Sequence, residues 1–292
     1  MIDLFNIPNS RQDIQIFNAN GSAWQTWSKP KKCSYVWIMC IGGAGGGGGG
    51  SGFQNYVLTT GGGSGAVSRV LYNSQQLPDR LYIQVGLGGN GGIAGGVSSV
   101  GLGGSSGTRS TVSLQPVVAS QNLVAISGGA AATGGSAFPG SVGETVSTQS
   151  TSTFYTLSNF ISTAGVGTSA NGSLSQANDI TPLTSQITCP GGGGSSANLN
   201  SASILATSIS PLIPSGTLNP SGNGGNGGNG IMSWKPFYSL GGAGGGSSQS
   251  GGIGGNGGDG GIGSGGGGGG SGAGGGGTGG KGGDGLVIII SF

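Results

Sequence analysis

The chain alternates short apolar runs with long stretches that carry almost no side chains. The strongest run is Tyr35–Ile41, seven residues without a charge, and Leu286–Ile290 near the end has the same character. An unbroken apolar run of this length indicates a β-strand covered on both faces. The pattern therefore predicts an all-β protein with a sandwich-like framework of short strands. Further strand candidates are residues 14–17, 66–72, 81–85, 112–114 and 123–126.

Inside the glycine-rich stretches, the remaining side chains recur at every third residue. This Gly-Gly-X spacing matches the three residues per turn of a polyproline II helix, which has no internal hydrogen bonds. The X side chains then lie along one edge of the helix, and the other two edges carry no side chain. Two such helices can approach until the N–H of one donates to the C=O of the other. We therefore predict an embedded polyglycine II helix bundle, with the side-chain-free tracts 45–50 and 265–270 inside it and polar X residues on its rim. The X residues are Asn223, Asn226, Asn229, Ile253, Asn256, Asp259, Ile262, Lys281 and Asp284.

Two other interpretations of the glycine are available. A flexible Gly/Ser linker is the commonest use of such composition, but here the spacing is regular and apolar strand-like runs bound each tract. Collagen requires one glycine per triplet with abundant proline, whereas these triplets carry two glycines and no proline. The bundle is therefore preferred over both.

The composition excludes several classes of binding partner and of metal or cofactor site. Charged residues make up 5% of the 292 residues and the net charge is +2, against roughly 25% charged residues in ordinary domains. Because no basic cluster exists, neither nucleic acid nor an anionic membrane is expected as a partner. There is no histidine, and Cys33, Cys40 and Cys189 suit neither a disulfide framework nor a zinc site. Cys40, in an apolar run, is expected as a buried thiol, and no cofactor or metal is expected.

Four segments follow from the shifts in composition. Residues 1–32 form a lead-in that could attach to another subunit, and residues 33–139 hold the strand framework and the first glycine tracts. Residues 140–220 are a Ser/Thr-rich insertion, and residues 221–292 form the glycine-rich bundle with a closing strand. The start shows no signal peptide, and no apolar run is long enough to cross a bilayer.

Six stretches carry a shared order of strands and glycine tracts: residues 27–30, 35–41, 42–48, 61–66, 85–89 and 282–288. Together they resemble the glycine-rich domain of bacteriophage tail and virion proteins. The resemblance implies a virion structural protein, assembled in the host cytoplasm, with other virion proteins and a host surface receptor as partners. The sequence leaves the oligomeric state open, and a homo-oligomer is one alternative. The glycine-rich adhesins at the tips of some phage tail fibres are similar in style, and there the loops of a polyglycine sandwich bind the receptor. The Ser/Thr-rich insertion departs from that pattern.

Motifs for chemistry are weak. Gly-x-Gly-x-x-Gly arises here from composition alone, and no βαβ unit surrounds it. Residues 275–281 approach a P-loop, but Gly282 replaces the Ser/Thr that would hold magnesium. Residues 279–287 fit a calcium-binding nonapeptide only once, although that repeat works in tandem. With no histidine and no sequence pairing of carboxylates, we expect no enzymatic activity.

Aromatic residues that interrupt the glycine are the candidate receptor-binding groups: Phe53, Tyr56, Trp234, Phe237 and Tyr238. Aromatic side chains are enriched at binding hot spots, but these could instead fold back and cap the bundle. The other tryptophans, Trp24, Trp27 and Trp37, are expected in the framework core. The expected function is host attachment on a phage tail fibre or virion surface. A structural cement or assembly protein and an ice-binding protein are the alternatives.

Overall fold

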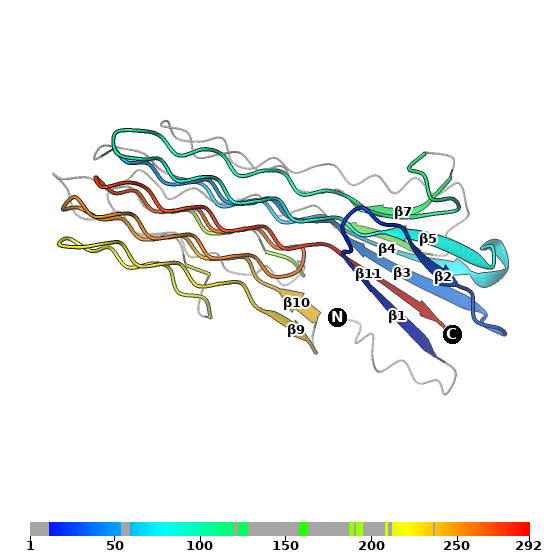
Figure 1. The fold of residues 1–292 in the computed structure, drawn as a ribbon. Coiled ribbons are helices and arrows are strands. Elements are labelled where there is room, and N and C mark those ends of the chain that lie inside the picture. Colours follow the sequence, from blue (N-terminus) through cyan, green and yellow to red (C-terminus); the bar gives the residue numbers. More distant parts are fainter. Residues whose placement is uncertain are drawn as a thin grey trace.

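The strands gather at one end of the molecule, and the glycine tracts run side by side from them toward a far end (Figure 1). The structure is a computed structural model. It describes residues 12–53, 59–119, 122–127, 158–162, 187–189, 191–194, 208–209, 212–235 and 237–292.

Two antiparallel sheets form the strand end, which confirms the expected all-β framework. The five-stranded sheet has the order β1-β11-β3-β4-β8, and the four-stranded sheet has the order β2-β5-β6-β7. A separate hairpin pairs β9 with β10. The strands are β1 Asp13–Asn18, β2 Gln25–Ser28, β3 Tyr35–Ile41, β4 Val67–Asn73, β5 Arg80–Gln84, β6 Ser110–Ser113, β7 Leu123–Ser127, β8 Ser158–Ser162, β9 Met232–Trp234, β10 Phe237–Ser239 and β11 Leu286–Ser291.

The predicted strand over residues 35–41 is covered on both faces, as its unbroken apolar run indicated. Successive side chains of a strand point to opposite faces, and β3 divides between two clusters accordingly. Val36, Ile38 and Cys40 lie in the cluster that also contains residues of β2, β5, β6 and β7, and Met39 and Ile41 lie in a second cluster. Burial raises the pKa of the Cys40 thiol to about 12, because the thiolate would lose its hydration.

The tryptophans expected in the core take different positions. Trp27 on β2 is fully buried in the first cluster, and Trp37 packs against the second. Trp24 is half-buried and belongs to neither cluster among the described residues. Residues 13–28, within the expected lead-in, supply β1 and β2, so part of this segment belongs to the framework.

Tract 264–272 lies at the centre of the bundle, where six neighbouring segments surround it. Successive N–H groups donate to different neighbours: Gly266 to Gly45, Gly267 to Gly258 and Gly268 to Gly192, at N···O distances of 3.1, 2.8 and 2.8 Å. Gly269 then returns to the first neighbour at Gly48. The tract donates to three segments, residues 42–52, 187–194 without Pro190, and 252–262. It accepts from three others, residues 59–66, 240–248 and 276–285.

Tract 42–52 repeats this rotation. Its N–H groups donate in turn to residues 99–108, 276–285 and 59–66, and the same neighbour recurs at every third residue. A period of three is what a polyglycine II helix requires, whereas the side chains of a pleated strand alternate with a period of two. We keep the polyglycine II helix as our interpretation of these tracts.

Bare glycine edges are what allow this close approach. A Cβ added at Gly267 would lie 2.0 Å from the carbonyl oxygen of Ala243, and one at Gly266 would lie 2.1 Å from that of Gly280. The predicted sorting is confirmed, since residues 45–50 and 265–270 are buried. The residues Asn223, Asn226, Asn229, Asn256, Asp259 and Lys281 are exposed, and Asp284 is half-exposed at the same rim.

The segments 33–139 and 221–292 interleave in one bundle, because tracts from each hydrogen-bond to tracts of the other. Within the Ser/Thr-rich insertion, Gly191 and Gly192 enter the bundle by donating to Gly62 and Gly242. The strand β8 adds to the edge of the larger sheet. The expected turn at residues 171–172 lies outside the described residues. In the part of the chain that is described, no helix has the length and apolar character needed to cross a membrane.

Candidate functional site

The X side chains on the bundle rim form a ladder from tract to tract. The Oδ1 atoms of Asn223, Asn226 and Asn229 accept the N–H groups of Ile253, Asn256 and Asp259, each at 2.9 Å. One tract further, Asn256 accepts from Thr278 at 2.9 Å and Asp259 from Lys281 at 2.7 Å. Each of these Asn and Asp side chains thus accepts a backbone N–H of the next tract, and that bond holds the side chain in place.

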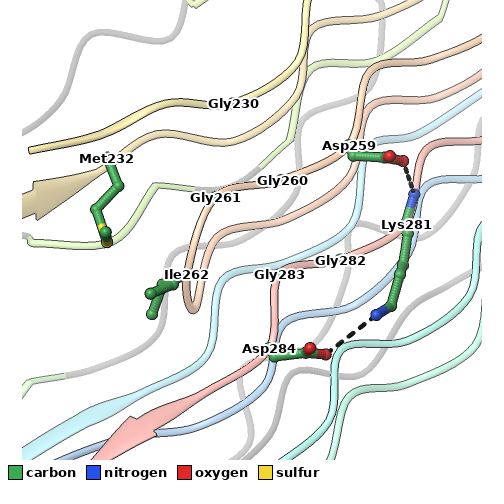
Figure 2. A pocket seen from close by; sticks show the side chains of 10 residues that line it. All are labelled: Gly230, Met232, Asp259, Gly260, Gly261, Ile262, Lys281, Gly282, Gly283 and Asp284. Carbon is green, nitrogen blue, oxygen red and sulfur yellow. Dashed lines mark hydrogen bonds and ion pairs between the residues drawn. The ribbon is translucent and has the colours of Figure 1, made fainter. Parts of the chain in front are cut away.

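A groove opens where this ladder reaches the strand end. It has a volume of about 410 Å³. The glycine pairs 260–261 and 282–283 supply a floor without side chains, and Gly230 lies at the edge. The side chains of Met232, Asp259, Ile262, Lys281 and Asp284 surround it (Figure 2).

Two carboxylates and one ammonium occupy the polar side of the groove. Lys281 Nζ lies 3.2 Å from Asp284 Oδ1, and both side chains remain partly exposed. Asp284 Oδ1 also accepts the N–H of Gly88 at 2.8 Å. In each aspartate one oxygen is therefore tied to the bundle, and the other oxygen, Oδ2, accepts no hydrogen bond from the described residues.

Three of the candidate receptor-binding residues lie together on the β9–β10 hairpin. Trp234 is exposed, and its ring lies 5.5 Å from that of Phe237, centroid to centroid. Phe237 packs against the second apolar cluster, while Tyr238 packs against a third cluster that contains Cys189 and Leu240. Trp234 is the most open of the three, and Phe237 and Tyr238 cover apolar residues.

Phe53 lies elsewhere, at the far end of the bundle. Gly52 forms a bridge to Val97, and Ser98 N donates to Gly52 O, so Phe53 adjoins the turn between tracts 86–97 and 99–108. That turn exposes apolar side chains: Val97 is 70% exposed, Ile93 66% and Leu102 60%. We call Phe53, Ile93, Val97, Val100 and Leu102 the distal tip.

The five candidate residues therefore do not form one site. Phe53 belongs to the distal tip, the hairpin holds three, and Tyr56 lies outside the described residues. Ile93, Val97 and Leu102 were not among the predicted binding residues, although a lone apolar residue in a glycine tract is visible in the sequence. The groove could not be predicted either, because the positions of Asp259, Lys281 and Asp284 in neighbouring tracts depend on the register between tracts.

A family of known proteins matches the chain over nearly the whole extent of the fold. The family described as "Glycine-rich domain" matches residues 18–291, which run from the end of β1 to the last residue of β11. No curated protein matches the chain. Since the matched region covers almost the whole chain, the protein belongs to the glycine-rich domain family.

Proposed function

We propose that this protein is an attachment protein of a phage virion, placed on a tail fibre or at the particle surface, which presents its distal tip to the host. The observation that carries the proposal is the distal tip itself. The turn between tracts 86–97 and 99–108 lies at the end of the bundle away from the sheets (Figure 1), and the five apolar side chains of the distal tip are exposed. Contiguous exposed apolar groups on a soluble protein mark interaction sites.

The bundle supports this function through its stiffness. Each interior tract is hydrogen-bonded to several neighbours along its whole length, so the tip is held at a fixed place relative to the sheets. Holding a contact surface rigid lowers the entropy lost on binding. The placement on a virion and the other virion proteins as partners rest on the resemblance to phage glycine-rich domains.

A tip variant tests the attachment function. We expect the fluorescently labelled full chain to bind whole cells of at least one strain in a panel of bacteria, measured by flow cytometry. The triple substitution Ile93→Ser, Val97→Ser and Leu102→Ser should reduce that binding at least tenfold, because it removes most of the exposed apolar surface of the distal tip.

The matched control removes exposed apolar groups at the other end of the molecule. Val117 and Val118 lie between β6 and β7 and are exposed, so Val117→Ser with Val118→Ser should leave cell binding unchanged. Absence of binding to every strain, or equal binding by the tip variant and the wild type, would contradict the proposal. If an antibody against the tip bound virions only after they had been disrupted, the tip would be buried in the particle. That result would favour a cement protein.

A further inference from the structure

We propose that the groove between the β9–β10 hairpin and the rim ladder is a binding site for a neutral saccharide. It is separate from the distal tip and does not depend on the attachment function. A pyranose has hydroxyl groups around its edge and a face of C–H groups. The groove offers a polar side and an apolar side on a floor without side chains (Figure 2).

The polar side suits hydroxyl groups. Asp259 and Asp284 each retain Oδ2 as an acceptor, since only Oδ1 is bonded to the bundle. Hydrogen bonds to ionised groups are about twice as strong as neutral ones. The Lys281 ammonium donates to a hydroxyl oxygen, while its backbone N–H holds Asp259 in place at 2.7 Å. These three side chains are therefore pre-positioned by the bundle before any ligand arrives.

The apolar side suits the C–H face. Met232 and Ile262 line the groove, and Ile262 is supported from behind by the second apolar cluster. Trp234 follows Met232 by two residues in β9, so both side chains lie on the same face of the hairpin, about 6–7 Å apart along the strand. This face extends the apolar wall with an exposed aromatic ring.

The charge of the groove selects among saccharides. Two carboxylates and one ammonium leave a net negative charge, which disfavours acidic sugars and accepts neutral ones. The Lys281 ammonium lies beside Asp284 and supplies the positive charge there, so binding should need no metal. The four floor glycines carry no side chain, and none is tolerated there, because an added Cβ would lie 1.7–2.6 Å from a neighbouring oxygen atom. The floor therefore stays bare, and a sugar ring can lie flat against it.

The rim ladder supplies a substitution that keeps the fold. Asn256 occupies the same place as Asp259 one repeat earlier, and its Oδ1 accepts the N–H of Thr278 just as Asp259 accepts that of Lys281. Asp259→Asn should therefore keep the ladder bond and replace only the ligand-facing carboxylate oxygen by an NH₂ group. The matched control is Asn256→Asp, which makes the reverse change outside the groove.

The test is saturation-transfer difference NMR on the full chain with glucose, galactose, mannose and N-acetylglucosamine, each at millimolar concentration, with and without EDTA. We expect transfer to at least one of these sugars, unaffected by EDTA. The dissociation constant should rise at least tenfold in Asp259→Asn and in Trp234→Ala, and stay within twofold in Asn256→Asp. Thermal unfolding of each variant checks that the bundle is intact.

Three outcomes would overturn the proposal. The first is no transfer to any of the four sugars, and the second is transfer that Asp259→Asn leaves unchanged in an intact protein. The third is an equal loss of affinity in Asn256→Asp, which would place binding outside the groove. Cell binding through the distal tip would be untouched by any of these results, so the two proposals fail separately.

Discussion

At the scale of single residues, the absence of a Cβ is the property that builds the bundle. A side chain is accepted at the X positions, where Asn256 and Thr278 point out and join the rim ladder. At positions that face a neighbouring tract, such as Gly267, no side chain fits. Glycine is therefore required at the positions that face a neighbouring tract. At the X positions of the rim, which lie three residues or fewer from such a position, other residues can replace it.

The substitution Gly267→Ala tests this distinction. Its Cβ would lie 2.0 Å from the carbonyl oxygen of Ala243, so two central tracts would have to separate and lose hydrogen bonds. Overpacking of this kind costs about 1–3 kcal/mol, and we expect the free energy of unfolding in urea to fall by that amount or more.

The control is Gly96→Ala at the exposed turn. There the nearest atom to an added Cβ is Ser99 Oγ, at 3.6 Å, so the unfolding free energy should change by less than about 0.5 kcal/mol, as for ordinary surface substitutions. Equal effects of the two substitutions would mean that the tracts are not closely packed.

At the scale of elements, hydrogen bonding between tracts replaces the burial of side chains. Ordering a residue costs about 1–2 kcal/mol, and a hydrogen bond returns about 0.5–1.5 kcal/mol net. A glycine tract alone therefore gains little from folding. The strands supply the apolar burial, because β3 leads directly into tract 42–52 and β11 directly follows tract 276–285. The sheets thus set the positions from which the tracts extend.

Native-state hydrogen exchange tests whether the interior glycine tracts are as well ordered as the strands. The amides of Gly266, Gly267 and Gly269 donate to interior partners and are buried, so they should exchange as slowly as the amides of β3. The N–H groups of rim residues such as Asn256, which bond to exposed side chains, should exchange faster. Exchange of the interior glycine amides within seconds would indicate a flexible linker in place of a bundle.

At the scale of the whole molecule, stability rests on apolar burial and backbone hydrogen bonds, with little contribution from charge. Among the described residues, the ion pairs are Lys29–Asp79 and Lys281–Asp284, and each has at least one widely exposed partner. Exposed pairs of this kind contribute about 0–1 kcal/mol. A protein with 5% charged residues can therefore keep its shape across large changes of ionic strength.

The small contribution of ion pairs predicts that the midpoint of thermal unfolding is nearly independent of salt concentration. Between 0.05 and 1 M sodium chloride, where the screening length falls from above about 10 Å to about 3 Å, we expect the thermal midpoint to shift by less than about 3 °C. Differential scanning calorimetry measures it. A fall of more than about 10 °C at high salt would show that ion pairs hold the fold together.

The sequence alone determined the apolar strands β1, β3, β4, β5, β6, β7 and β11 and the chemistry of the tracts, but it did not indicate β2, β8, β9 or β10. Unbroken apolar runs predicted β3 and β11, because burial on both faces requires apolar side chains at every position. The triplet spacing predicted which tracts are interior, because a tract without X residues has three edges open to close contact. These features follow from local pattern and needed no knowledge of distant contacts.

Only the tertiary structure decided which tracts are neighbours and where the sites lie. Every tract presents nearly the same glycine edges, so the sequence contains no signal for the order in which tracts pack or for their register. That register places Asp259, Lys281 and Asp284 beside Met232, and it separates Phe53 from the aromatic hairpin by the length of the bundle. The identical backbone of the tracts makes them able to pack in many arrangements, and the sheets that anchor their ends select one.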